Sequence, residues 1–71
     1  MGMTVTVEAL ARLTESDPAT AELLTKFWDL SFGTLTSMAF DAQLNEAGLV
    51  DSTDKDVQFV IEMIKRNIAS Q

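Results

Sequence analysis

The chain contains neither cysteine nor histidine, and this most limits how its 71 residues can fold. Without cysteine no disulfide can cross-link the chain, and the thiolate and imidazole ligands of structural zinc sites are missing. A chain this short buries only about 60% of the surface that its unfolded form exposes, so its folded state has little stability in reserve. Packing of apolar side chains must therefore hold the fold together, and the 46% hydrophobic content is enough to expect a core.

The spacing of apolar and helix-breaking residues predicts where the first two helices lie. The first spans about residues 5–15. Asp17 and Pro18 mark the start of the second, because Asp accepts hydrogen bonds from free amides and Pro suits the first helical position. Gly33 and Gly48 are expected to end the second and third helices in a left-handed conformation.

The two later segments differ in their patterns. About residues 53–69 apolar side chains recur at i, i+3, i+4 and i+7, with charged residues opposite, which predicts a strongly amphipathic helix capped by Ser52 or Thr53. In residues 34–47 apolar residues form two stripes on nearly opposite sides, Leu35, Met38, Ala39 and Ala42 on one and Phe40, Leu44 and Ala47 on the other. Two stripes predict a helix between two neighbours, or a less regular segment.

Together these segments predict an all-α fold, a compact bundle of four short helices in a single domain over residues 1–71. The only strand-like alternation, near the amino terminus, has no second strand to pair with. The second and fourth helices are expected to form most of the core.

The net charge of the chain limits the classes of partner that it is expected to bind. Eleven acidic residues against five basic ones give a net charge of −6. This charge opposes nucleic-acid binding, which needs a basic surface to displace counterions from phosphates, and suits a basic protein partner. No apolar run approaches the ~20 residues of a membrane span, and no signal-like segment opens the chain. We therefore expect a cytoplasmic protein that binds neither nucleic acid nor membrane.

The residue types also argue against catalysis. Histidine, the commonest general base, is missing, and every Asp and Glu falls on a polar helix face or at a helix end. A calcium loop starting at Asp51 would need an oxygen ligand at its fifth position and a glycine at its sixth, where the chain has Lys55 and Asp56. We expect no enzyme, no catalytic residue and no metal site.

The apolar positions of the second and third helices cover a wider arc than four short helices can easily bury. Trp28 lies at the edge of the arc beside Phe32, and tryptophan is enriched at interface hot spots, so core and interface are both open for it. We predict an interaction surface formed by Trp28, Phe32, Met38 and Phe40. A protein partner or a second copy of the chain would cover it.

Residues 44–52, LNEAGLVDS, resemble the segment that ends in the phosphopantetheine-bearing serine of stand-alone acyl and peptidyl carrier proteins. A Leu-x-Glu-Ala-Gly-Leu-aliphatic-Asp-Ser run is typical of that family. The resemblance implies a small, acidic, all-helical carrier with 4'-phosphopantetheine on Ser52. Thr53 departs from the family, which usually has Leu or Met after the serine. The other interpretation of Ser52 is a helix cap.

The sequence thus predicts a small non-enzymatic protein–protein interaction module without a cofactor, of the adaptor, regulator, docking or inhibitor kind. The alternative is a carrier protein loaded on Ser52.

Overall fold

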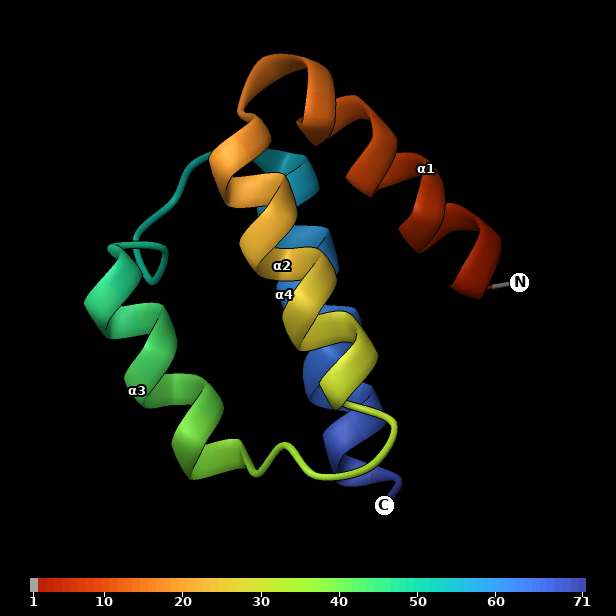
Figure 1. Ribbon diagram of the computed structural model, residues 1–71, viewed down its shortest axis with the longest axis vertical. Helices are drawn as coiled ribbons and strands as arrows, with labels where there is room; N and C mark the ends of the chain where they lie inside the picture. Colours follow the sequence, from red (N-terminus) through yellow and green to blue (C-terminus); the bar gives the residue numbers. More distant parts are fainter. Residues whose placement is uncertain (1) are drawn as a thin grey trace.

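Four α-helices and no strand make up the part of the chain that the computed structural model describes, the backbone of residues 2–71 and the side chains of residues 4–71. The all-α bundle that the sequence predicts is confirmed. Its Cα radius of gyration is 11.1 Å, and about 11 Å is expected for a compact domain of this length. The helices are α1 (Gly2–Ser16), α2 (Pro18–Leu30), α3 (Ser37–Ala47) and α4 (Lys55–Ala69) (Figure 1).

Two predicted helix boundaries are confirmed. Asp17 caps α2, since its Oδ1 accepts a hydrogen bond from the backbone N–H of Thr20 at 3.3 Å, and Pro18 is the first helical residue. Gly48 ends α3 with a φ of 72°, a left-handed conformation that glycine adopts without steric cost.

The predicted end of α2 is wrong. The helix stops at Leu30, and Ser31 follows in the right-handed region. Among the described residues Gly48 alone has a positive φ, so Gly33 is not a left-handed stop. The backbone N–H groups of Gly33 and Leu35 both donate to the carbonyl of Leu30 at 3.1 Å. A hydrogen-bonded turn, not a glycine conformation, therefore ends this helix.

The predicted cap of α4 is also wrong. The helix begins at Lys55, and Asp54 caps it. The Asp54 Oδ1 accepts hydrogen bonds from the backbone N–H groups of Asp56 at 2.8 Å and Val57 at 3.3 Å. Neither Ser52 nor Thr53 takes this role, because a carboxylate stands closer to the free amides of the first turn.

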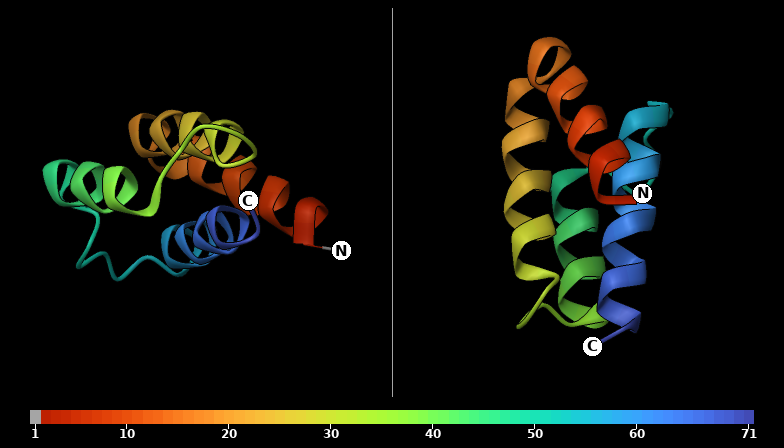
Figure 2. Two further views of the ribbon diagram at one scale, coloured as in Figure 1. Left: turned by 90° about the horizontal axis from the view of Figure 1, so that it is seen from below. Right: turned by 90° about the vertical axis from the view of Figure 1, so that its right-hand side faces the viewer.

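The helices pack unequally. α1 lies across α2 and α4 and contacts both more extensively than these two contact each other. α3 stands to one side, with α4 as its main neighbour (Figures 1 and 2). As predicted, α2 and α4 form most of the core, with seven of its thirteen side chains, and α1 adds three, as many as α4. The core consists of Ala9, Leu10, Leu13, Ala21, Leu24, Phe27, Trp28, Leu35, Phe40, Leu44, Val57, Val60 and Ile64.

A buried serine ties the end of the chain to the α2–α3 connection. The Ser31 hydroxyl donates to the carbonyl of Trp28 at 2.6 Å and accepts a hydrogen bond from Asn67 Nδ2 at 3.1 Å. Gln71 Nε2 donates to the carbonyls of Ser31 at 2.8 Å and Leu35 at 3.2 Å. These bonds fix the course of the connection that leads to α3.

An ion pair joins α1 to the first turn of α4. Arg12 donates from Nε and a terminal guanidinium nitrogen to the Asp56 carboxylate, with a shortest distance of 2.8 Å. These hydrogen bonds hold the pKa of Asp56 below its ordinary value and raise the pKa of Arg12. The acid also lies where the helix dipole favours negative charge.

None of the helices in residues 2–71 combines the length and the apolar character needed to cross a bilayer.

Candidate interaction surface

Two of the four predicted interaction residues lie in the core. Phe40 has no exposed surface, and its ring packs edge-on against Phe27 with 5.5 Å between centroids. Trp28 is 8% exposed and belongs to the same core. In this conformation neither side chain is available to a partner, because the core buries the apolar side of α2 and the inner stripe of α3.

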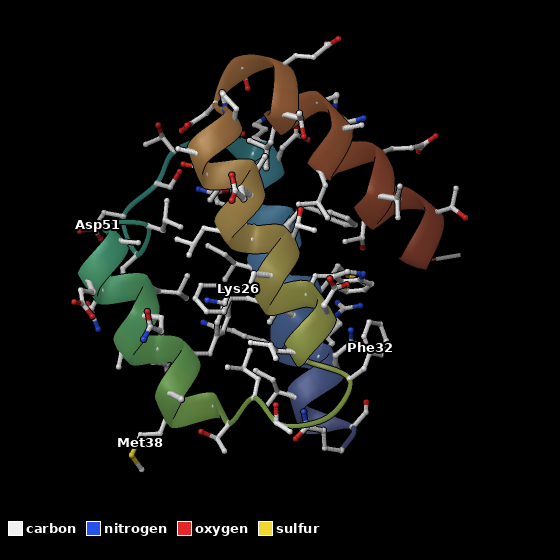
Figure 3. The ribbon with its side chains drawn as sticks, in the orientation of Figure 1. Lys26, Phe32, Met38 and Asp51 are labelled. Carbon is white, nitrogen blue, oxygen red and sulfur yellow. The ribbon has the colours of Figure 1, made fainter. Side chains whose placement is uncertain are left out.

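The other two residues are exposed but do not form one patch. Phe32 is 55% exposed and packs edge-on against Trp28 at 5.0 Å, and Met38 is 82% exposed. Figure 3 shows them on opposite sides of the molecule, with Met38 pointing away from the bundle at the start of α3. The structure therefore does not bring the predicted residues together as a single site.

The outward side of α3 is the surface that the structure leaves uncovered. Of the predicted stripe of Phe40, Leu44 and Ala47, the core buries the first two and leaves Ala47 exposed. Of the other predicted stripe, Met38, Ala39 and Ala42 are exposed, whereas Leu35, which precedes α3, is buried in the core. Asp41 and Glu46 are exposed too, and the helical repeat of 100° per residue places them on either side of the stripe that contains Met38 and Ala42. We name this area the α3 surface and define it as Met38, Asp41, Ala42, Glu46 and Val50.

The stretch of chain that carries the α3 surface has acidic side chains only, although Lys65 of α4 lies across the groove beside it. Residues 27–54 contain five acidic side chains and no lysine or arginine. The flanking cations are Lys26 on α2 and Lys55 at the start of α4. In Figure 3 Asp51 lies beyond the end of α3 opposite to Met38, so acids extend along the whole helix and into the following turn.

A shallow groove of about 260 Å³ runs beside the α3 surface, between α3 and α4. Its apolar lining consists of Leu44, Leu49, Val50 and Ile61, and its polar lining of Asp41, Asn45 and Lys65. Binding clefts for drug-sized ligands usually measure about 300–1,000 Å³ and enclose most of the ligand. The groove is smaller and open, which suits the side chains of a partner better than a small-molecule substrate.

Two other depressions have more balanced charges. One, on α4, combines Phe59 and Met63 with Lys55, Glu62 and Arg66. The other, on α2, combines Ala19 and Leu23 with Glu22 and Lys26. Each contains charges of both signs, as does the groove between α3 and α4 with Asp41 and Lys65.

Ser52 lies in the turn that joins α3 to α4, partly buried and three positions before the first residue of α4. Its hydroxyl accepts a hydrogen bond from the backbone N–H of Asp54 at 3.3 Å, and its carbonyl accepts one from Gln58 Nε2 at 2.8 Å. The serine is thus part of a hydrogen-bonded turn rather than of the helix. Its loading with phosphopantetheine stays a prediction.

Residue-by-residue reasoning missed Asp41, Glu46 and Val50 as members of a candidate site. A signal for the acids was present in the sequence, in the stretch without cations between Lys26 and Lys55. Val50 carried no such signal, because its exposure depends on how the turn after α3 closes.

Among the described side chains no cluster of three or more acids is placed to hold a metal ion. Comparison of the chain with models of protein families, with curated proteins and with solved structures finds no match.

Proposed function

We propose that this protein is a small non-enzymatic interaction module that binds another protein through the α3 surface. The observation that carries the proposal is the exposure of Met38, Ala39 and Ala42 on α3. The two apolar stripes of the sequence predict a helix with neighbours on two sides. In the described part of the chain, other helices pack against α3 on one side only. A partner protein would cover the other.

The composition of the α3 surface supports the same proposal. Met38 and Val50 are more than half exposed at 82% and 57%, and both project from a region whose charged side chains are all acidic. Apolar anchors within a charged rim are the usual anatomy of a protein interface. The one-signed charge would attract a basic partner and reject acidic ones.

Other function classes receive less support. The net charge of −6 opposes binding to phosphate backbones, so nucleic acid is not among the proposed partners. The described residues show polar groups in capping and packing roles rather than converging in an enclosed cavity, which favours a binding role over catalysis. The lack of cysteine fits a cytoplasmic setting, where folds do without disulfides.

The test compares matched variants as bait in an extract of the source cells. One variant carries Met38→Ser and Glu46→Lys on the α3 surface. The control carries Val7→Ser and Glu15→Lys on the exposed side of α1, which also replace an exposed apolar side chain by serine and an acid by lysine. A partner retained by the wild type and the control but lost by the α3 variant would support the proposal. Identical captured sets for all three baits would contradict it.

Loading of phosphopantetheine on Ser52 is the second candidate, favoured by the resemblance of residues 44–52 to carrier proteins and by the position of this serine on a turn beside acidic side chains. Incubation with coenzyme A and a broad-specificity phosphopantetheinyl transferase should then add the mass of one phosphopantetheine group. The Ser52→Ala variant should show no addition. An unchanged wild-type mass beside a modified control carrier would end this candidate.

A further inference from the structure

We infer that hydrogen bonds from the last turn of α4 form a latch that keeps α3 closed against the bundle. The latch consists of the bonds that Asn67 and Gln71 donate to the α2–α3 connection, residues 31–36. When these bonds break, α3 opens as a unit while α1, α2 and α4 stay packed. The inference concerns the chain without a partner and stands apart from the proposed function.

The packing makes α3 the helix that separates most easily. It stands at one edge of the bundle with α4 as its main neighbour, and its buried side chains are Phe40 and Leu44. An open groove of about 260 Å³ lies between the two helices. α1, α2 and α4 contact one another and share most of the core. Because segments with few buried apolar contacts open locally while the rest of a domain stays folded, the bundle divides into a three-helix body and a separable α3.

Polar bonds attach the connection before α3 to this body. Ser31 is fully buried, and its hydroxyl accepts a hydrogen bond from Asn67 Nδ2 at 3.1 Å. Gln71 Nε2 donates to the carbonyls of Ser31 at 2.8 Å and Leu35 at 3.2 Å. Figure 1 shows the connection and the last turn of α4 at the same end of the bundle. Neither Asn67 nor Gln71 belongs to α3, so the latch acts on this helix from a distance.

The bond to Leu35 couples the latch to the position of α3. Leu35 is buried in the core and lies two residues before Ser37, where α3 begins. An outward movement of α3 therefore displaces Leu35 and separates its carbonyl from Gln71. Loss of a partner at a buried polar group costs more than loss of an exposed hydrogen bond, which favours the closed form.

Opening of α3 changes the surface that the chain presents. In the closed form the Phe40 ring has no exposed surface and packs edge-on against Phe27 of α2, with 5.5 Å between centroids. Separation of α3 from the body exposes both rings. The latch thus controls whether this apolar contact is covered or open to solvent.

Native-state hydrogen exchange of the full chain, recorded by NMR where each rate reports an opening equilibrium, tests the inference. In the wild type the amides of Phe40 and Leu44 should exchange faster than the slowest amides of α1 and α2. The latch variant carries Asn67→Ala and Gln71→Ala. The control variant carries Arg66→Ala and Ser70→Ala, in the same last turn, whose side-chain bonds stay within α4.

The latch variant should raise exchange of the α3 amides about tenfold, because it weakens the closed form relative to the open one. Gln71→Ala alone should give part of this increase. The control variant should leave the α3 amides unchanged, since the bonds it removes survive in the open form.

Three results would overturn the inference. The first is wild-type exchange of the α3 amides in the latch variant, even if the slowest amides of the body accelerate, because the latch would then survive the opening of α3. The second is equal acceleration of the α3 amides by both variants. The third is exchange of the wild-type α3 amides as slow as that of the slowest amides of the body.

Discussion

At the scale of single residues, the neighbouring acids Asp54 and Asp56 have different structural roles. Asp54 accepts hydrogen bonds from the first free amides of α4, and Asp56 accepts from Arg12 of α1. Ser52, two positions before the cap, accepts a bond from the N–H of Asp54 and so shapes the approach to the helix. A sequence in which several neighbouring residues can cap a helix does not reveal which one does, because that choice depends on the path of the preceding turn.

The assignment of Asp54 as the cap predicts unequal effects of two alanine substitutions. Asp54→Ala should lower the free energy of unfolding by about 1 kcal/mol, the usual cost of losing a helix cap. Ser52→Ala should cost clearly less, because the serine hydroxyl accepts one hydrogen bond at 3.3 Å and caps no helix. Urea unfolding followed by circular dichroism measures both. A larger loss for Ser52→Ala would contradict the assignment.

Two glycines provide a second residue-scale test. An added Cβ would meet no atom within 4 Å at Gly33 or at Gly48, so the two sites differ in backbone conformation rather than in space. Gly48→Ala should destabilise the protein by about 1–2 kcal/mol, because alanine is strained at a φ of 72°. Gly33→Ala should be neutral or slightly stabilising. Equal changes in Tm for the two variants would contradict the difference in backbone conformation between Gly33 and Gly48.

The Arg12–Asp56 pair predicts a pH dependence with a definite sign. Its hydrogen bonds lower the pKa of Asp56 in the folded state. The pair therefore adds stability above the unfolded-state pKa of the carboxyl and loses it as the pH falls through the lower folded-state pKa. Asp56→Asn should lower Tm modestly at neutral pH, and the difference from wild type should vanish in acid.

A matched substitution controls this prediction. Glu62→Gln removes a longer, well-exposed contact to Arg66 at 3.5 Å within α4, which should matter less. A Tm difference between wild type and Asp56→Asn that persists unchanged into acid would contradict the role given to Asp56.

At the scale of elements, the pattern of apolar residues predicted where the helices lie better than it predicted how they pack against one another. The regular repeat in α4 led directly to Val57, Val60 and Ile64, which are all buried. Packing divides each of the two stripes predicted for residues 34–47: Phe40 and Leu44 are buried but Ala47 is exposed, and Met38, Ala39 and Ala42 are exposed but Leu35 is buried. Phe40 is buried in the core, where its ring packs against that of Phe27. Spacing alone could not show which apolar residues of this segment the core buries and which remain exposed.

The peripheral position of α3 predicts lower local stability. Its buried residues are Phe40 and Leu44, whereas α2 buries four residues. Segments with few buried apolar contacts open more readily to hydrogen exchange. The amides of α3 should therefore exchange faster than those at the centres of α2 and α4 in native-state hydrogen exchange. Equal protection of all three helices would show that α3 is held more firmly than its packing suggests.

At the scale of the whole molecule, the bundle is flat, with dimensions of 30 × 29 × 17 Å. A flat domain of this size has much surface for little core, and a partner that binds only the folded state would add to its stability. The net charge of −6, on which the proposal of a basic partner rests, follows from composition alone. The location of the exposed apolar side chains does not follow from composition, because spacing makes Trp28 and Phe40 as available as Met38, and only the packing of the helices buries them.

The central claim is that a partner covers α3, and hydrogen–deuterium exchange of the chain alone and in complex with its captured partner measures this most directly. Residues 37–51 should gain protection on binding, whereas the exposed side of α1 should exchange as before. The claim would be contradicted by protection that appears on α1 or on the outward side of α4 while residues 37–51 exchange at an unchanged rate.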